Sequence, residues 1–138
     1  IIYNKKNQIG TEQIYAHEYN KPPNKLDVQE LDSKIEELYR IDKKRAHIVH
    51  KYFKDMEQNI INIRRYLKKE GSYVLVVGDC EIRKIIFPVY KYLIEISKRN
   101  NYKNSMVFSY IIRNPYLRIP RKTRGGLIKY DRVIVLNN

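Results

Sequence analysis

The sequence contains no tryptophan, one cysteine and only five glycines among its 138 residues. Cys80 stands alone, so the chain has neither an internal disulfide nor a Cys-x-x-Cys pair for zinc. The glycines form neither a G-x-G-x-x-G turn nor a P-loop. No apolar run approaches the roughly 20 residues that a membrane-spanning helix needs. These absences exclude a disulfide-stapled protein and an integral membrane protein, and we expect a cytoplasmic one.

Acidic residues are also scarce, because 15 Asp and Glu face 28 Lys and Arg, a net charge of +13. The imbalance lies mainly in the second half of the chain. Residues 71–138 carry 13 basic and 4 acidic side chains, against 15 and 11 in residues 1–70. Such a field attracts polyanions, of which nucleic acid is the commonest. An anionic membrane surface or an acidic partner is the alternative.

The length predicts one domain with a hydrophobic core, preceded by an irregular arm. Residues 1–26 lack clear periodicity and end in "NKPPNK", whose prolines disfavour both helix and central strand. We therefore assign residues 27–138 to the folded domain. The chain opens "IIYNKKN", with neither Met nor a secretory segment, and we expect it to begin inside a longer polypeptide.

Two helices are predicted at the start of the domain. Asp27 and Glu30 have the spacing of a capping box, so the first helix should begin there and end near Tyr39. The second should begin near Asp42 and end at Gly71. Its apolar stripe could form a groove for a partner helix, but packing into the core is the expected role. The stripe consists of Val49, Phe53, Met56, Ile60, Ile63 and Leu67.

Strands and one further helix are predicted in the second half. The run "YVLVV", residues 73–77, has no alternation and predicts a strand covered on both faces, as in a parallel sheet. A helix with Pro88 in its first turn should follow and end at Asn100 and Asn101. Residues 105–113 and 128–136 predict two antiparallel neighbouring strands. The expected class is therefore α/β.

Few residues predict catalytic or metal chemistry. His47 and His50 have a helical spacing that metal sites use, but no further ligands accompany them, so we expect no metal. No local signature of a nucleophile is present, and we assign no catalytic residue. Asp79 follows the buried strand at its carboxyl end, where open α/β sheets bind ligands. Asp79 is therefore a candidate for the rim of a cleft, although it could simply cap the following turn.

The segment "RNPYLRIPRKTRGG", residues 113–126, is the sharpest feature of the sequence. Arginine forks pair with phosphate oxygens, and glycine allows a close approach of the backbone to nucleic acid. Seven basic residues, the last of them Arg132, and one acidic residue lie from position 113 to position 132. We therefore predict nucleic-acid contact, with a solvated basic loop or an oligomer linker as the alternatives. The predicted contact residues are Arg113, Asn114, Tyr116, Arg118, Arg121, Lys122, Arg124 and Lys129.

The order of these features resembles a known family. "RRYLKKEGSYVLVVGD", "IIFPVYKYLIEISKRN" and "FSYIIRNPYLRIPRKTRGGLIKYDRVIVL" resemble the carboxyl-terminal half of site-specific DNA methyltransferases that modify exocyclic amino groups. The upstream stretches "IGTEQIY" and "YRIDKKRAHIVHKYFKDMEQNI" are similar to the region after the catalytic motif of that family. The resemblance implies a partial Rossmann-like sheet, formed by its last three strands with an antiparallel edge hairpin.

The family's defining motifs are missing from this chain. The resemblance implies S-adenosylmethionine as methyl donor, bound by a glycine-rich turn, and a Pro-Pro-aromatic turn that holds the flipped base. Neither turn is present, because no aromatic residue follows Pro22 and Pro23. Cys80 also stands where the family often has Asn. A chain without both turns cannot orient the base nitrogen toward the donor, so we expect it to be inactive alone.

Three hypotheses follow from the sequence. The first is the carboxyl-terminal part, or one subunit, of an adenine or cytosine DNA methyltransferase, whose missing amino-terminal half or complementary subunit supplies catalysis and most of the donor site. The second is a non-catalytic DNA- or RNA-binding module on a methyltransferase-like scaffold. The third is a structural or dimerisation domain. DNA is the partner expected from the first hypothesis, and no membrane is expected.

Overall fold

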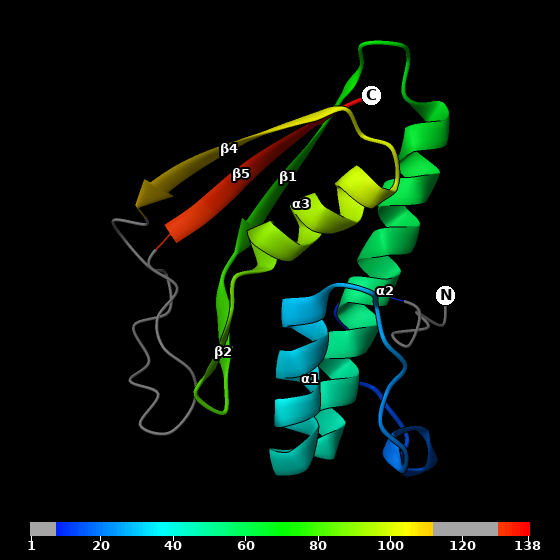
Figure 1. Ribbon diagram of the computed structural model, residues 1–138, viewed down its shortest axis with the longest axis vertical. Coiled ribbons are helices and arrows are strands. Elements are labelled where there is room, and N and C mark those ends of the chain that lie inside the picture. The colour runs from blue at the N-terminus through cyan, green and yellow to red at the C-terminus, as the bar shows by residue number, and fades with distance from the viewer. Residues whose placement is uncertain (1–7, 112–129) are drawn as a thin grey trace, which may run out of the picture. The chain divides into compact units, whose positions relative to one another are not determined.

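A computed structural model describes residues 8–111 and 130–138 of the chain (Figure 1). The chain divides into two compact units, Ile1–Asn59 and Ile60–Asn138. Helix α2, Lys43–Tyr66, begins in the first unit and ends in the second.

The first unit consists of an irregular segment and a pair of helices. Apart from the 3-10 turn η2, Ala16–Tyr19, residues 8–26 form no helix or strand, as predicted. Helix α1, Gln29–Ile41, is followed by the single residue Asp42 and then by α2. The Asp42 carboxylate accepts a hydrogen bond from the Arg45 amide at 3.1 Å, which explains why α2 begins there.

The predicted start of α1 is wrong in its detail. The N-cap residue is Val28, and no side chain caps the helix. Asp27 adopts a left-handed backbone conformation, with φ of +60°, one position too early to cap. Asp32 fixes the entering chain instead, because its carboxylate accepts the Leu26 amide at 2.8 Å.

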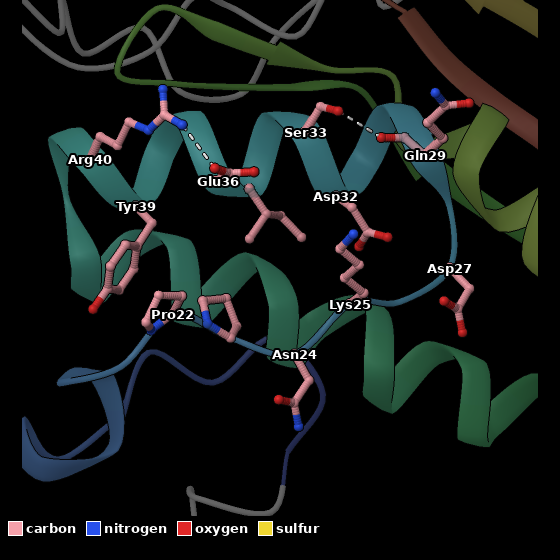
Figure 2. Close-up of a pocket in the computed structure, with 12 residues that line it drawn as sticks. Pro22, Asn24, Lys25, Asp27, Gln29, Asp32, Ser33, Glu36, Tyr39 and Arg40 are labelled. Carbon is pink, nitrogen blue, oxygen red and sulfur yellow. Dashed lines mark hydrogen bonds and ion pairs between the residues drawn. The ribbon is translucent and has the colours of Figure 1, made fainter.

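The apolar stripes of α1 and α2 form the core of the first unit. Leu31, Ile35 and Leu38 of α1 are buried. Val49 and Phe53 on α2 are buried too, so the predicted packing role of its stripe is confirmed there. Figures 1 and 2 show α1 alongside the first turns of α2.

Helix α2 ends earlier than predicted. Its last helical residue is Tyr66, and residues 67–71 form a turn in which the Gly71 amide donates to the Lys68 carbonyl. The left-handed residue is Glu70, with φ of +66°, rather than Gly71. Gly71 is needed for space, because a Cβ there would lie 2.9 Å from the Lys68 carbonyl oxygen.

The second unit is built on a three-stranded sheet in the order β1-β5-β4 (Figure 1). The strands are β1, Ser72–Gly78, β4, Asn104–Ile111, and β5, Tyr130–Asn137. Strand β5 pairs antiparallel with both neighbours, so β1 and β4 run parallel to each other. The prediction that the last two strands are antiparallel neighbours is confirmed.

Helix α3, Val89–Arg99, connects β1 to β4 and packs on one face of the sheet. It ends before Asn100, as predicted, but Pro88 is its N-cap rather than part of its first turn. Tyr92, Leu93 and Ile96 of α3 are buried. On the sheet, Ile134 and Leu136 are fully buried.

The prediction that β1 is covered on both faces is wrong among the described residues. Exposure alternates along the strand, and the side chains of Val74 and Val76 are 53% and 60% exposed. The physical reason is that β1 is an edge strand in an antiparallel pair, with a helix on only one side.

A short hairpin between β1 and α3 was not predicted. Strands β2, Cys80–Ile82, and β3, Ile85–Phe87, pair antiparallel through the two residues Arg83 and Lys84. Both of these residues have positive φ, +52° and +68°. Such turns usually carry Asn or Gly, and the sequence gives no such signal here.

The fold is therefore mixed α/β, with a mostly antiparallel main sheet. In the part of the chain that the structure describes, no helix has the length and apolar character to cross a membrane.

Candidate nucleic-acid interface

Three strand ends meet at one edge of the main sheet. Gly78 at the carboxyl end of β1 pairs with Asp131 near the start of β5, and Asp131 pairs with Tyr110 near the end of β4. One step further along, Ile111 pairs with Tyr130. Ile111 and Tyr130 flank the basic segment 112–129. The residues on either side of that segment therefore lie at the same end of the sheet as the carboxyl end of β1, which Asp79 follows.

Arg132 is the centre of a polar cluster at this edge. Its guanidinium carbon lies 5.0 Å from the ring centroid of Tyr90 in α3 and 5.3 Å from that of Tyr130 in β5. It donates a short hydrogen bond to the Ser109 hydroxyl in β4. Two rings and a hydroxyl thus hold the guanidinium on the α3 face of the sheet.

Asp79 completes the cluster. Its Oδ2 lies 3.7 Å from an Nη of Arg132, which makes a long ion pair. The other carboxylate oxygen of Asp79 and the Nε of Arg132 are shielded from water without a hydrogen-bond partner. Shielded polar groups without partners cost free energy, so this pair is not fully satisfied. The interpretation of Asp79 as a turn cap finds no support, since its carboxylate faces Arg132.

The opposite face of the same edge carries Tyr110 and Asp131. A hydrogen bond with Asp131 raises the pKa of the Tyr110 hydroxyl, so this hydroxyl remains a neutral donor. Cys80 follows Asp79, and burial, with the Asp79 charge adding to it, raises the pKa of its thiol to about 11. A thiol with that pKa is a poor nucleophile near neutral pH.

Of the predicted site residues, only Asp79 belongs to the described part of the chain. Lying outside it are Arg113, Asn114, Tyr116, Arg118, Arg121, Lys122, Arg124 and Lys129.

Sequence reasoning missed Tyr90, Ser109 and Tyr130, and it counted Arg132 only as a continuation of the segment's charge. Arg132 lies in the predicted strand, where it is half-buried and paired with Asp79. The sequence carried a partial signal, because Tyr130 and Arg132 are two positions apart in a strand and must share a face. Ser109 required the register of β4 on β5, and Tyr90 required the position of α3.

The first unit contains a hollow of about 790 Å³ between the segment Pro22–Asp27 and α1 (Figure 2). Several of its polar side chains already have partners within the first unit. Glu36 pairs with Arg40 at 2.8 Å, and Asp32 holds the Leu26 amide. The Tyr39 hydroxyl donates to the Tyr19 carbonyl. We therefore assign no ligand to this hollow.

His47 and His50 each interact with other residues of the first unit. The Nε2 atom of His47 lies 2.8 Å from the Lys21 carbonyl oxygen. Burial, together with the positive charge of Lys54, lowers the pKa of His50. Within residues 8–111 and 130–138, no three His, Cys, Asp or Glu side chains are grouped so that they could hold a metal ion.

Comparisons with known proteins add no relative to this picture: no protein-family model, curated protein or solved structure matches the chain.

Proposed function

We propose that this chain is the carboxyl-terminal part, or one subunit, of a DNA amino-methyltransferase that transfers a methyl group from S-adenosylmethionine to adenine or cytosine. In this proposal the chain contributes one edge of a Rossmann-like sheet and a basic segment that contacts DNA. A complementary polypeptide supplies the donor pocket and the turn that holds the flipped base.

One observation carries the proposal: the basic segment starts and returns at the strand end that Asp79 follows. Ile111 and Tyr130 are a directly opposed pair, one step beyond the pair of Tyr110 and Asp131. The cations of this segment would therefore be available to bind phosphates next to the carboxyl end of β1. Open α/β sheets bind their ligands at such carboxyl ends. The antiparallel pairing of β4 with β5 supports the same proposal, because the family resemblance implies an antiparallel hairpin at the edge of the sheet.

The residues of this chain would have two roles. Arg113, Arg118, Arg121, Lys122 and Arg124 would bind phosphates, which gives affinity and register on the duplex. The cluster of Arg132, Tyr90 and Ser109 would hold the first residues of β5 in place. The carboxyl end of the basic segment would then be attached to a fixed strand. Asp79 would lie at the rim of the cleft.

The described residues of this edge do not form a site for S-adenosylmethionine. The Asp79 carboxylate is directed at Arg132, and the glycine-rich turn that the resemblance implies for donor binding is not in the sequence. We therefore assign donor binding to the complementary polypeptide.

Methyl transfer by a reconstituted pair tests the proposal directly. The chain would be mixed with the polypeptide encoded immediately upstream of residue 1, duplex DNA and donor carrying a labelled methyl group. We expect label on adenine or cytosine amino groups only when both polypeptides are present. Absence of transfer to any duplex of varied sequence would contradict the proposal.

DNA affinity as a function of salt tests the role of the basic segment. With three to five phosphate contacts, the logarithm of the affinity should fall with the logarithm of salt with a slope of about −3 to −5. Arg121→Ala with Arg124→Ala should reduce this slope by about two. The matched control is Arg40→Ala with Lys44→Ala in the first unit, which removes the same charge and should leave the slope unchanged. Equal effects of the two pairs would show that only net charge matters.

A non-catalytic DNA- or RNA-binding module is the second candidate. The absence of both a donor-binding turn and a base-holding turn from the sequence favours it, because contact of the basic segment with nucleic acid needs neither turn. Salt-dependent binding of DNA or RNA, without methyl transfer in the reconstituted mixture, would support this candidate over the first.

A further inference from the structure

The face of the main sheet opposite α3 is apolar and exposed. The register places Val74, Val135 and Met106 in one row across the three strands. A second row consists of Val76, Val133 and Phe108. We call these six residues the bare face.

The exposure of the bare face is large. The side chains of Val74, Val76, Met106 and Phe108 are 51% to 60% exposed. Val133 and Val135 in the central strand are half-buried. Within the second unit, none of the described elements packs over these rows. Contiguous apolar surface of this kind marks interaction sites in soluble proteins.

The sequence of the strands is that of a sheet with cover on both sides. An antiparallel sheet with one solvated face normally alternates apolar and polar residues, whereas β1 carries Val74 and Val76 on its exposed side. On the other face, α3 covers β1 and β5 with the apolar side of an amphipathic helix. A helical cover suits the bare face for the same reason, because its two rows are also apolar and a helix buries such a face of a sheet.

The net charge of the chain indicates which kind of partner can bind to the bare face. A second copy would bring two surfaces of net charge +13 together, which is repulsive. In the second unit, residues 60–111 and 130–138 hold 11 basic and 5 acidic side chains. A partner of net negative charge is therefore favoured over self-association.

We infer that the bare face is the docking surface for a polypeptide of net negative charge that presents the apolar side of an amphipathic helix. The identity of this polypeptide rests on the proposed function, which makes it the complementary half that supplies catalysis. Docking removes the six apolar residues from water and completes the second helical layer of the sheet.

Binding of the upstream polypeptide to the full chain tests the inference. Val76→Thr with Phe108→Thr removes apolar surface while keeping residues that favour strands. We expect this pair to weaken binding by about 30-fold or more. The matched control is Ile41→Thr with Tyr66→Thr, which replaces exposed apolar residues outside the sheet. The control should change affinity by less than about threefold, and circular dichroism should show that both variants fold.

Two further measurements address the occupant. A dye that fluoresces on apolar surfaces should bind the chain alone, and the bare-face variant should bind less dye. Affinity for the partner should fall as salt rises, because the charges are opposite. Dye binding that the variant leaves unchanged would overturn the inference, since another segment of the chain would then cover the face. A wild-type dimer in sedimentation that the variant converts to a monomer would also overturn it, as would salt-independent binding.

The outcomes separate this inference from the proposed function. Binding that depends on the bare face, without methyl transfer to any DNA, would support the docking surface and contradict the methyltransferase. Methyl transfer with unchanged partner affinity in the bare-face variant would contradict the docking surface alone. Absence of binding by the wild-type chain would overturn the docking surface, and the DNA affinity of the chain alone would still test its basic segment.

Discussion

Arg132 shows how a single side chain joins several elements. Its partners come from the end of β1, from α3, from β4 and from its own strand. Among the described residues, its Nε nevertheless has no acceptor, and one oxygen of Asp79 has no donor. The polar side chains at this end of the sheet are therefore held in place, but not all of their hydrogen-bonding groups have partners, which is a common property of functional sites.

His50 should titrate below the ordinary histidine range. Burial and the charges of Lys54 and His47 lower its pKa, and the Asn24 backbone and Asp32 only partly oppose them. The unfolded chain therefore takes up a proton more readily, so stability from this group is present above pH 6.5 and is lost as the pH falls below it. NMR titration should give a midpoint below 6.5 for the His50 ring. The loss of stability in acid should be smaller in His50→Gln, and a midpoint above 6.5 would contradict this account.

Cys80 should react slowly with alkylating reagents. Burial raises the pKa of its thiol to about 11, whereas the ordinary value for an exposed thiol is 9.0. Folding therefore disfavours the thiolate, and stability falls between these two pH values as the unfolded chain ionises first. Alkylation by iodoacetamide at pH 8 should be slow in the native chain and fast in urea. Between about pH 9 and 11, the free energy of unfolding of the wild type should therefore fall relative to that of Cys80→Ala. Equal alkylation rates in the two states would refute the burial argument.

Regular elements followed the sequence where periodicity was strong. The packing of the α2 stripe in the first unit, the end of α3 before Asn100 and the strand at β4 were all predicted. Element ends were less predictable, because Asp32 rather than Asp27 fixes the entry to α1. At the site, Asp79 was predicted from its place after a strand. The grouping around Arg132 could not be, because it depends on strand register and on the packing of α3.

The turn of the β2–β3 hairpin should be strained. Lys84 has φ of +68°, a region that glycine adopts without steric cost. Lys84→Gly should therefore stabilise the chain by about 0.5–1 kcal/mol, after allowing for the greater freedom of glycine in the unfolded state. Urea unfolding would measure this gain.

The same change in a helix provides the control for Lys84→Gly. Lys91 is exposed in α3, and Lys91→Gly should destabilise the chain by up to about 1 kcal/mol. Destabilisation by both changes would show that the left-handed turn is not strained.

At the scale of the whole molecule, the net charge of +13 should oppose folding at low salt. Raising chloride from about 0.01 M to 1 M shortens the screening length from about 30 to 3 Å, so the melting temperature should rise. The variant Lys68→Glu with Lys69→Glu lowers the net charge to +9 and should show a smaller rise. A melting temperature that does not depend on chloride would contradict the role of self-repulsion.

Asn138 has a consequence for how the protein should be handled in the laboratory. Its side-chain amide donates to the carbonyls of Leu67 and Lys68, and its backbone amide donates to the Gly71 carbonyl. The residue thereby fastens the turn after α2 to the end of β5. Substitution of Asn138 would release that turn, so labels and cysteine probes are better introduced elsewhere in the chain.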